Sequence, residues 1–161
     1  MQPNLFHATI DSPLGPLLAV GDEHELHGLH MQEGRRPRTL GAGWREAREP
    51  FARLRSQLGE YFAGERTSFE LELRPAGTPF QQRVWDALGD IPYGGTVSYG
   101  ELARQIGAPA ASRAVGTANA RNPLCVVVPC HRVIGTSGAL TGYAGGLERK
   151  RLLLDLEARA A

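Results

Sequence analysis

The chain has 161 residues, 42% hydrophobic and 22% charged, and its 18 basic and 17 acidic residues leave a formal net charge of +1. This length fits one domain or two small lobes, and the two cysteines exclude a disulfide framework and the usual four-ligand zinc finger. The longest stretch without a charged residue or histidine, residues 133–147, is too short to span a membrane. The N-terminus lacks the features of a signal peptide, so we expect a soluble, cytoplasmic protein.

The first third of the chain is typical of short β-strands. Brief apolar-rich runs at residues 5–10, 17–20 and 26–31 predict three strands. The turn cluster at residues 11–16 favours a β-meander of the first two. Residues 33–43 are polar and rich in Gly and Arg, which predicts an exposed loop.

A helical period begins at Pro50 and stops at Gly64. One face of this predicted helix carries Phe51, Leu54, Leu58, Tyr61 and Phe62. Apolar residues at 69, 71 and 73 then alternate with charged ones, which predicts a half-exposed strand. The break at residues 74–77 predicts a boundary between an N-terminal β-rich lobe, residues 1–76, and a C-terminal domain, residues 77–161.

The second half is predicted to be mainly helical. Thr78 to Gln81 and Ser98 to Glu101 each form a capping box, so a helix is expected to begin at both. A further helix is expected over residues 110–120, after a turn that contains Gly107. Two short helices across such a turn match a helix-turn-helix in outline, although plain helix packing has the same pattern. The whole chain is therefore predicted to be an α+β protein with two lobes.

Residues 110–120 are unusual because only Arg113, Val115 and Asn119 have sizeable side chains. Small residues let a helix backbone lie close against another helix or against nucleic acid, and both interpretations stay open at this point. Residues 1–75 hold nine basic against eleven acidic residues, whereas residues 76–161 hold nine against six. The basic excess therefore lies in the half with the helix pair, as in a nucleic-acid-binding surface.

The residues with the clearest chemistry are Cys130 and His131, which follow an apolar run that stops at Pro129. Thiolate is the nucleophilic form of cysteine, and a nearby base promotes its formation. Adjacent side chains of an extended strand point to opposite faces, so either the chain turns here or a water molecule links the two side chains. Cys125 fits a small buried hydrophobe. A carboxylate near the end of the helix over residues 147–156 is expected to orient the histidine, and both Glu157 and Asp155 are candidates.

The motif Pro-Cys-His-Arg-Val at residues 129–133 resembles the active-site motif of O6-alkylguanine-DNA alkyltransferases, the methylated-DNA–protein-cysteine methyltransferases. Only residues 33–48 carry no signature of that family. The resemblance also rests on the following segments: residues 11–15, the helix with Trp85, residues 92–94, 98–99, 112–116 and 122–123, and Leu-Thr-Gly-Tyr-Ala-Gly-Gly-Leu at residues 140–147.

The resemblance implies direct-reversal DNA repair, in which the alkyl group of O6-alkylguanine in double-stranded DNA moves irreversibly to the protein's own cysteine. O4-alkylthymine is a second candidate substrate. Cys130 matches the nucleophile, His131 its base through a water molecule, and Glu157 the carboxylate that holds the histidine. Asn122 matches the asparagine that ties the helix-turn-helix to the active-site turn. Because a thioether resists hydrolysis, each chain is expected to react once.

The resemblance also implies how DNA and the base are bound. A target base is flipped out of the duplex, with the helix-turn-helix in the minor groove. Tyr99 matches the tyrosine that crowds the target phosphate and donates a hydrogen bond to the departing guanine. Arg113 matches the finger that fills the vacated place in the stack. The remaining residues expected at the DNA are Ser112, Ala114, Gly116 and Thr117, and those expected at the base are Val133, Tyr143 and Ala144, with the carbonyl of Cys130.

No cofactor, metal or obligate protein partner is expected. His24, His27 and His30 repeat every three residues, but on a strand His27 faces away from the other two, so they do not converge on a metal ion. Two alternatives to alkyl transfer stay open. One is a non-catalytic relative that binds alkylated DNA, although such relatives replace the cysteine. The other is an unrelated Cys-His hydrolase, which does not explain the helix pair or Arg113.

Overall fold

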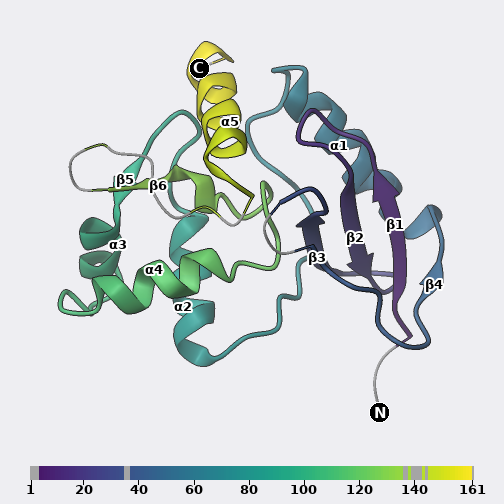
Figure 1. Ribbon diagram of the computed structural model, residues 1–161, viewed down its shortest axis with the longest axis horizontal. Coiled ribbons are helices and arrows are strands. Elements are labelled where there is room, and N and C mark those ends of the chain that lie inside the picture. The colour runs from purple at the N-terminus through teal and green to yellow at the C-terminus, as the bar shows by residue number, and fades with distance from the viewer. Residues whose placement is uncertain (1–3, 35–36, 136–137, 139–142, 144, 161) are drawn as a thin grey trace.

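The computed structural model describes residues 4–34, 37–135, 138, 143 and 145–160. Figure 1 shows two parts side by side, a β-sheet with one helix formed by the N-terminal segment and a group of helices formed by the C-terminal segment. The predicted α+β fold is confirmed. The division into two domains at residues 76 and 77 stays a prediction.

The sheet of the N-terminal segment is the expected meander with one added strand. Strands β1 (Phe6–Ile10), β2 (Leu17–Gly21) and β3 (Leu26–Met31) pair antiparallel in sequence, and the sheet order is β3-β2-β1-β4. The short β4 (Arg45–Glu46), which the sequence did not predict, runs parallel to β1. All five residues of β2 are buried, as expected for a central strand covered on both faces.

The helix predicted from Pro50 is present. A 3₁₀ turn, η1 (Glu49–Phe51), leads into α1 (Ala52–Phe62), and the apolar face predicted for this helix is buried apart from the half-exposed Phe62. Gly64 follows with φ +79°, a left-handed conformation that suits glycine, and the helix ends as predicted. Tyr61 is completely buried, on the side of α1 that meets the C-terminal segment.

The strand predicted from residues 69, 71 and 73 is wrong except at its end. Only Leu73 forms a bridge, with Leu26 at the edge of the sheet. Upstream, the side-chain amide of Gln57 accepts from the backbone N–H of Glu70 at 2.9 Å and donates to its carbonyl at 3.1 Å. A side chain of α1 therefore takes the place of a neighbouring strand, and no ladder forms there.

Both predicted capping boxes are confirmed in the C-terminal segment. Helix α2 (Pro79–Leu88) begins with Thr78 and Gln81, and α3 (Tyr99–Gln105) begins with Ser98 and Glu101. Helix α4 (Ser112–Ala120) packs against both of them and starts two residues later than predicted. The indole N–H of Trp85 donates to the carbonyl of Ala118 at 2.9 Å, which fixes α4 on α2.

The rest of the C-terminal segment connects these helices with α5. The 3₁₀ turn η2 (Cys130–Arg132) leads into β6 (Val133–Ile134), which pairs in parallel with β5 (Val97–Ser98), and neither strand was predicted. Helix α5 (Leu147–Ala160) runs four residues beyond its predicted end because residues 157–160 contain no helix breaker. Among the described residues, no helix is long and apolar enough to cross a membrane.

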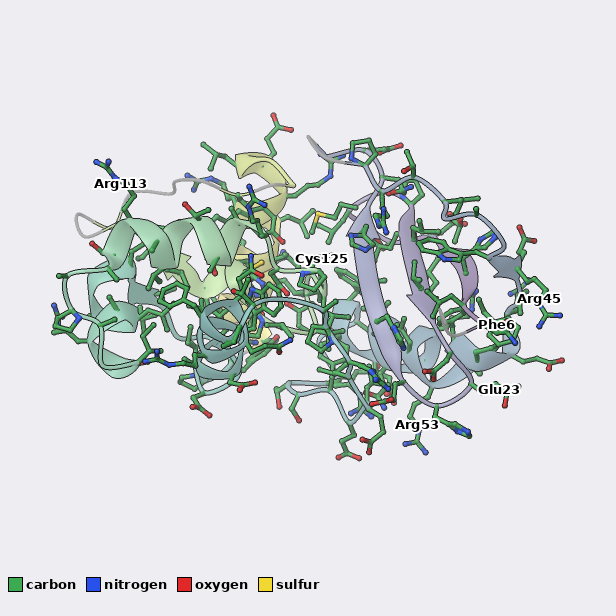
Figure 2. All side chains as sticks on the ribbon, turned by 90° about the horizontal axis from the view of Figure 1, so that it is seen from below. Phe6, Glu23, Arg45, Arg53, Arg113 and Cys125 are labelled. Atoms are coloured by element: carbon green, nitrogen blue, oxygen red, sulfur yellow. The ribbon has the colours of Figure 1, made fainter. Side chains whose placement is uncertain are left out.

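The two segments meet at β3. The backbone N–H of Leu29 donates to the carbonyl of Pro123 at 2.8 Å, and the N–H of Cys125 donates to the carbonyl of Leu29 at 3.2 Å. Figure 2 shows Cys125 at this junction, between the helices and the sheet. The chain that continues from Cys125 to Cys130 is therefore anchored at its start by the sheet.

Candidate active site

The chain turns sharply on its way to Cys130 instead of continuing as a strand. The backbone N–H of Val127 donates to the carbonyl of Cys125 at 2.8 Å, around Val126 at φ +70°. Val126 is the only non-glycine residue in the described part of the chain with positive φ, a conformation that costs a β-branched residue free energy. Cys130 then opens η2. The chain therefore turns here, as one of the two possibilities left open by the sequence required.

His131 is completely buried, and its Nε2 lies 2.7 Å from Oε2 of Glu157. Hydrogen bonds and the positive groups around it hold the pKa of Glu157 at about 2, against the opposing effect of burial. Because an ionised carboxylate only accepts, Nε2 of His131 carries the proton and Nδ1 is the acceptor nitrogen. Burial lowers the pKa of His131, so the ring is neutral at pH 7. Glu157, and not Asp155, is therefore the carboxylate that orients the histidine.

Glu157 binds more groups than the sequence indicated. Arg132 donates from Nε to Oε1 at 2.8 Å and from Nη2 to Oε2 at 3.0 Å, and Tyr61 Oη donates to Oε2 at 2.6 Å. Arg132 is also held by the carbonyl of Ile91 at 2.7 Å. Sequence reasoning missed both residues: Tyr61 has the pattern of a core position of α1, while the place of Arg132 beside His131 was a usable signal.

A cavity of about 370 Å³ lies in front of Cys130, at the junction of β3, α2, α4 and the chain around residue 143. This volume is within the usual range for small-molecule pockets. Besides Cys130, the residues of its lining that carry polar or sulfur atoms include Asn119, Asn122, Cys125 and Tyr143. Cys125, expected to be a buried bystander, is only half-buried and lines this cavity.

The Cys130 thiol is protonated in the resting protein. Burial raises its pKa, while the Asn122 amide and the Lys150 ammonium act in the opposite direction. Its Sγ has no hydrogen bond to His131, whose Nδ1 has no partner among the described residues. A base that acts on this thiol must therefore reach it through an intervening group.

Lys150 is the single lysine of the chain, and it is completely buried. Its Nζ donates to the carbonyl of Val133 at 2.6 Å, and burial lowers its pKa to about 8. Its position in α5 is on the same face as the buried Leu153 and Glu157, but sequence reasoning missed it because a lysine at such a position is normally exposed. Lys150 therefore places a positive charge close to Cys130 and fixes the orientation of the Val133 carbonyl.

Asn122 is hydrogen-bonded to the turn that leads to Cys130. Its Nδ2 donates to the carbonyl of Val128 at 2.8 Å, and its Oδ1 accepts from the backbone N–H of Leu124 at 3.0 Å. Because Asn122 lies two residues after α4, these bonds connect that helix with the turn leading to Cys130.

The outer face of α4 carries the residues expected at DNA. Figure 2 shows Arg113 pointing away from the helix, and Ser112, Ala114 and Thr117 are exposed beside it. Gly116 lies against the ring of Tyr99, where an added Cβ would be 3.6 Å from Cδ1. The two helices therefore approach closely at Gly116, with Tyr99 at the N-terminus of α3.

Comparison with known proteins agrees with this geometry. Residues 79–159 match the family model "6-O-methylguanine DNA methyltransferase, DNA binding domain", and residues 5–75 match "6-O-methylguanine DNA methyltransferase, ribonuclease-like domain". The chain belongs to this family. A methylated-DNA–protein-cysteine methyltransferase of Mycolicibacterium paratuberculosis is 56% identical over 155 residues, covering 95% of this chain and 92% of the relative. One of Methanosarcina acetivorans is 51% identical, covering 95% of this chain and 98% of the relative.

Solved structures of family members have the same fold. The crystal structure of Mycobacterium tuberculosis OGT in complex with DNA is 54% identical, with a TM-score of 0.91, and covers 97% of this chain and 94% of that chain. The O6-methylguanine methyltransferase of the same organism has a TM-score of 0.89 at 53% identity, over 98% of this chain and 94% of that one. Family membership thus favours the resemblance over a Cys-His hydrolase and over a non-catalytic binding protein.

The remaining sequence predictions concern Ala144 and the histidines of the N-terminal segment. Ala144 lies outside the described residues, so its predicted place at the base stays a prediction. His27 is hydrogen-bonded to Asp22 at 3.0 Å, and burial lowers the pKa of His30 to about 4. Across the described part of the chain, no three His, Cys, Asp or Glu side chains are grouped as metal ligands.

Proposed function

We propose that this protein repairs DNA by transferring the alkyl group of O6-alkylguanine to Sγ of Cys130. O4-alkylthymine is the second candidate substrate. The observation that carries the proposal is the position of Cys130 on the wall of a cavity, with the His131–Glu157 pair directly behind it. The family and its DNA-bound relative support DNA as the partner.

The transfer begins with removal of the thiol proton. His131 Nδ1 takes this proton through a water molecule, and the charge of Glu157, 2.7 Å from Nε2, stabilises the imidazolium that forms. The Sγ lone pair then forms a bond to the alkyl carbon while the bond from that carbon to O6 breaks. The electron pair of the broken bond stays on the guanine, which takes up one proton from solvent, while the His131 imidazolium returns its proton to solvent. Tyr99 donates a hydrogen bond to the departing base.

The base is held by backbone groups of the active-site turn. We assign the carbonyls of Cys130 and Val133 as acceptors for the exocyclic amino group of guanine. The bond from Lys150 fixes the Val133 carbonyl in place. Tyr143, which is buried and lines the cavity, and the backbone at Ala144 complete the pocket.

The target nucleotide has to leave the duplex because Cys130 is buried. We propose that α4 enters the minor groove, whose width of about 6 Å admits only a helix face of small side chains. Ser112, Ala114, Gly116 and Thr117 provide that face, and Arg113 fills the vacated place in the stack. Tyr99, beside Gly116, crowds the target phosphate.

Each chain is consumed by a single transfer. A thioether is not hydrolysed under mild conditions, so the modified Cys130 has no route back to the thiol. No cofactor and no obligate protein partner enter the proposal, and the predicted cytoplasmic location remains part of it.

Intact and peptide mass spectrometry test this function. After incubation with duplex DNA containing O6-methylguanine, the protein should gain the mass of one methyl group on the peptide that contains Cys130. Cys130→Ala should gain none, whereas Cys125→Ala, a matched change at the other cysteine of the cavity, should still be methylated at Cys130. A wild-type protein without added mass, or a Cys130→Ala variant with it, would refute the proposal.

A further inference from the structure

The turn between β1 and β2 contains residues 11–15, one of the segments on which the family resemblance rests, and the proposed function gives it no role. Ser12 fixes this turn: its Oγ accepts from the backbone N–H of Leu14 at 3.1 Å and donates to the carbonyl of Gly15 at 2.7 Å. Gly15 has φ +88°, where a side chain would be strained. The backbone of Leu14, a residue that is 1% exposed, is thereby held in one orientation.

Arg149, in the first turn of α5, binds the carbonyl of Leu14. Its Nε donates to that oxygen at 2.9 Å, and its Nη1 donates to the carbonyl of Gly145 at 3.2 Å. Its Nη2 lies 3.5 Å from Oε1 of Glu33, whose side chain is 59% exposed, and a surface ion pair of this kind contributes little. The guanidinium therefore joins two backbone carbonyls, one from the N-terminal segment and one from the C-terminal segment.

Gly145 belongs to the wall of the cavity that contains Cys130, as does Tyr143. It is buried and tightly enclosed by two side chains: an added Cβ would lie 2.4 Å from Sδ of Met31 and 2.8 Å from Cε2 of Tyr143. Because protein interiors are close-packed, a shift of Gly145 has to move the Tyr143 ring or Met31 with it. The position of this wall therefore depends on what holds the Gly145 carbonyl.

We propose that Arg149 is a positioning residue for alkyl transfer: it ties the cavity wall at Gly145 to the turn between β1 and β2 and thereby sets where the flipped base lies relative to Sγ of Cys130. This inference rests on the proposed function. The N-terminal segment then takes part in the reaction, because a fixed turn of its sheet determines the position of one wall of the pocket that holds the base.

The contacts of Arg149 separate this role from proton removal and from DNA binding. Its hydrogen bonds go to two carbonyls and to Glu33, and none of them, within the described part of the chain, reaches the His131–Glu157 pair or α4. Loss of the guanidinium should therefore slow the transfer step without changing its pH dependence or the affinity for the duplex.

The test is Arg149→Met, which removes the donors and keeps an unbranched apolar stem. A trace of duplex containing O6-methylguanine is mixed with excess protein at increasing concentration, and the rate of Cys130 methylation is followed to its plateau. The plateau rate constant should fall by about ten-fold or more, because a misplacement of roughly 1 Å can cost about 10²-fold. The protein concentration at half-plateau should stay close to the wild-type value, and the slowing should be equal at every pH.

Arg149→Lys keeps the positive charge but not the fork of donors, so it should recover only part of the plateau rate, and it carries the comparison if the methionine variant does not fold. Arg151→Met is the matched control, since it makes the same change at an exposed arginine of the same helix, and its plateau rate should equal that of the wild type.

The fraction of chains methylated at completion distinguishes positioning from folding. A slower plateau in a protein whose chains all react supports the proposal. An unchanged plateau with fewer reactive chains would show that Arg149 only supports the fold and would overturn it, as would a shifted pH dependence or equal slowing in Arg151→Met. Absence of transfer to the wild-type protein would instead refute the proposed function.

Discussion

Tyr61→Phe tests whether the N-terminal segment takes part in the active site. The substitution removes one hydroxyl group and keeps the aromatic ring, which packs against Phe62, Phe69 and Tyr93. That hydroxyl donates to Oε2 of Glu157 at 2.6 Å, the same oxygen that faces Nε2 of His131. The variant therefore isolates one hydrogen bond between α1 and the His131–Glu157 pair.

The size of the effect follows from the charge on Glu157. A hydrogen bond to a charged group contributes about 1.5–3 kcal/mol to stability, against about 0.5–1.5 kcal/mol for a neutral pair. Both partners are buried, so solvent does not replace the lost donor. At pH 7 we expect the free energy of unfolding to fall by about 1.5–3 kcal/mol, and each kcal/mol lowers Tm by roughly 2–4 °C for a chain of this size.

The loss of stability caused by Tyr61→Phe should become smaller as the pH falls. The pKa of Glu157 is lowered from 4.5 to about 2, so the stabilisation from its charge is complete above pH 4.5 and is lost as pH falls toward 2. Once Glu157 is protonated, the bond to Tyr61 becomes a neutral one. The difference between wild type and Tyr61→Phe should therefore shrink to about 0.5–1.5 kcal/mol at the acid end.

Urea unfolding from pH 7 down to the lowest pH at which the wild type is folded measures this difference, and rates of Cys130 methylation are recorded alongside. Tyr93→Phe is the matched control: Tyr93 lies 6.2 Å from the Tyr61 ring, and its hydroxyl has no partner among the described residues. The control should change stability little. If Tyr61→Phe is no more destabilising than Tyr93→Phe, or if its effect does not shrink in acid, the reasoning fails.

Three further variants test other parts of the molecule. Arg113→Ala should slow methylation from damaged duplex about tenfold or more, because unpairing costs a few kcal/mol, while reaction with free O6-benzylguanine base stays nearly unchanged; equal loss on both would contradict the finger role. In the wild type, the free energy of unfolding should rise between about pH 8 and 10.5, because Lys150 loses its proton near pH 8 in the folded state and near pH 10.5 in the unfolded state. Lys150→Met should abolish this rise in unfolding experiments, and a rise that persists would have to come from another group. Thr78→Ala removes the cap of α2 and should lower the free energy of unfolding by about 1 kcal/mol in thermal melts, and an unchanged Tm would mean that this cap is not limiting.

The sequence predicted best what depends on neighbours along the chain. The capping boxes at Thr78 and Ser98 set helix starts through bonds that reach only three residues, and both are present. The apolar face of α1 could be predicted from the helical period for the same reason. The strand predicted at residues 69–73 failed because its backbone bonds go to Gln57, which is distant in sequence.

The candidate site divides in the same way. Cys130 and His131 are adjacent, so their motif was visible, whereas the choice of Glu157 over Asp155 depended on how α5 packs. Tyr61 lies 96 residues from its partner in the sequence, and a completely buried lysine is too rare for a sequence pattern to predict. Such residues become visible only when the tertiary contacts are known.

Two sets of hydrogen bonds hold the turn that contains Cys130 and His131, and changes to the two sets should have different effects. On one side, Asn119 and Asn122 connect the end of α4 with the carbonyls of Cys130 and Val128, so the helix proposed to enter the groove sets the position of the turn. On the other side, Glu157 joins α5 and α1 behind His131. A change at Asn119 should therefore alter the rate of methylation of Cys130 and leave the acid dependence of stability unchanged. A change at Tyr61 should alter that acid dependence, because its hydroxyl contacts the carboxylate and not the cavity.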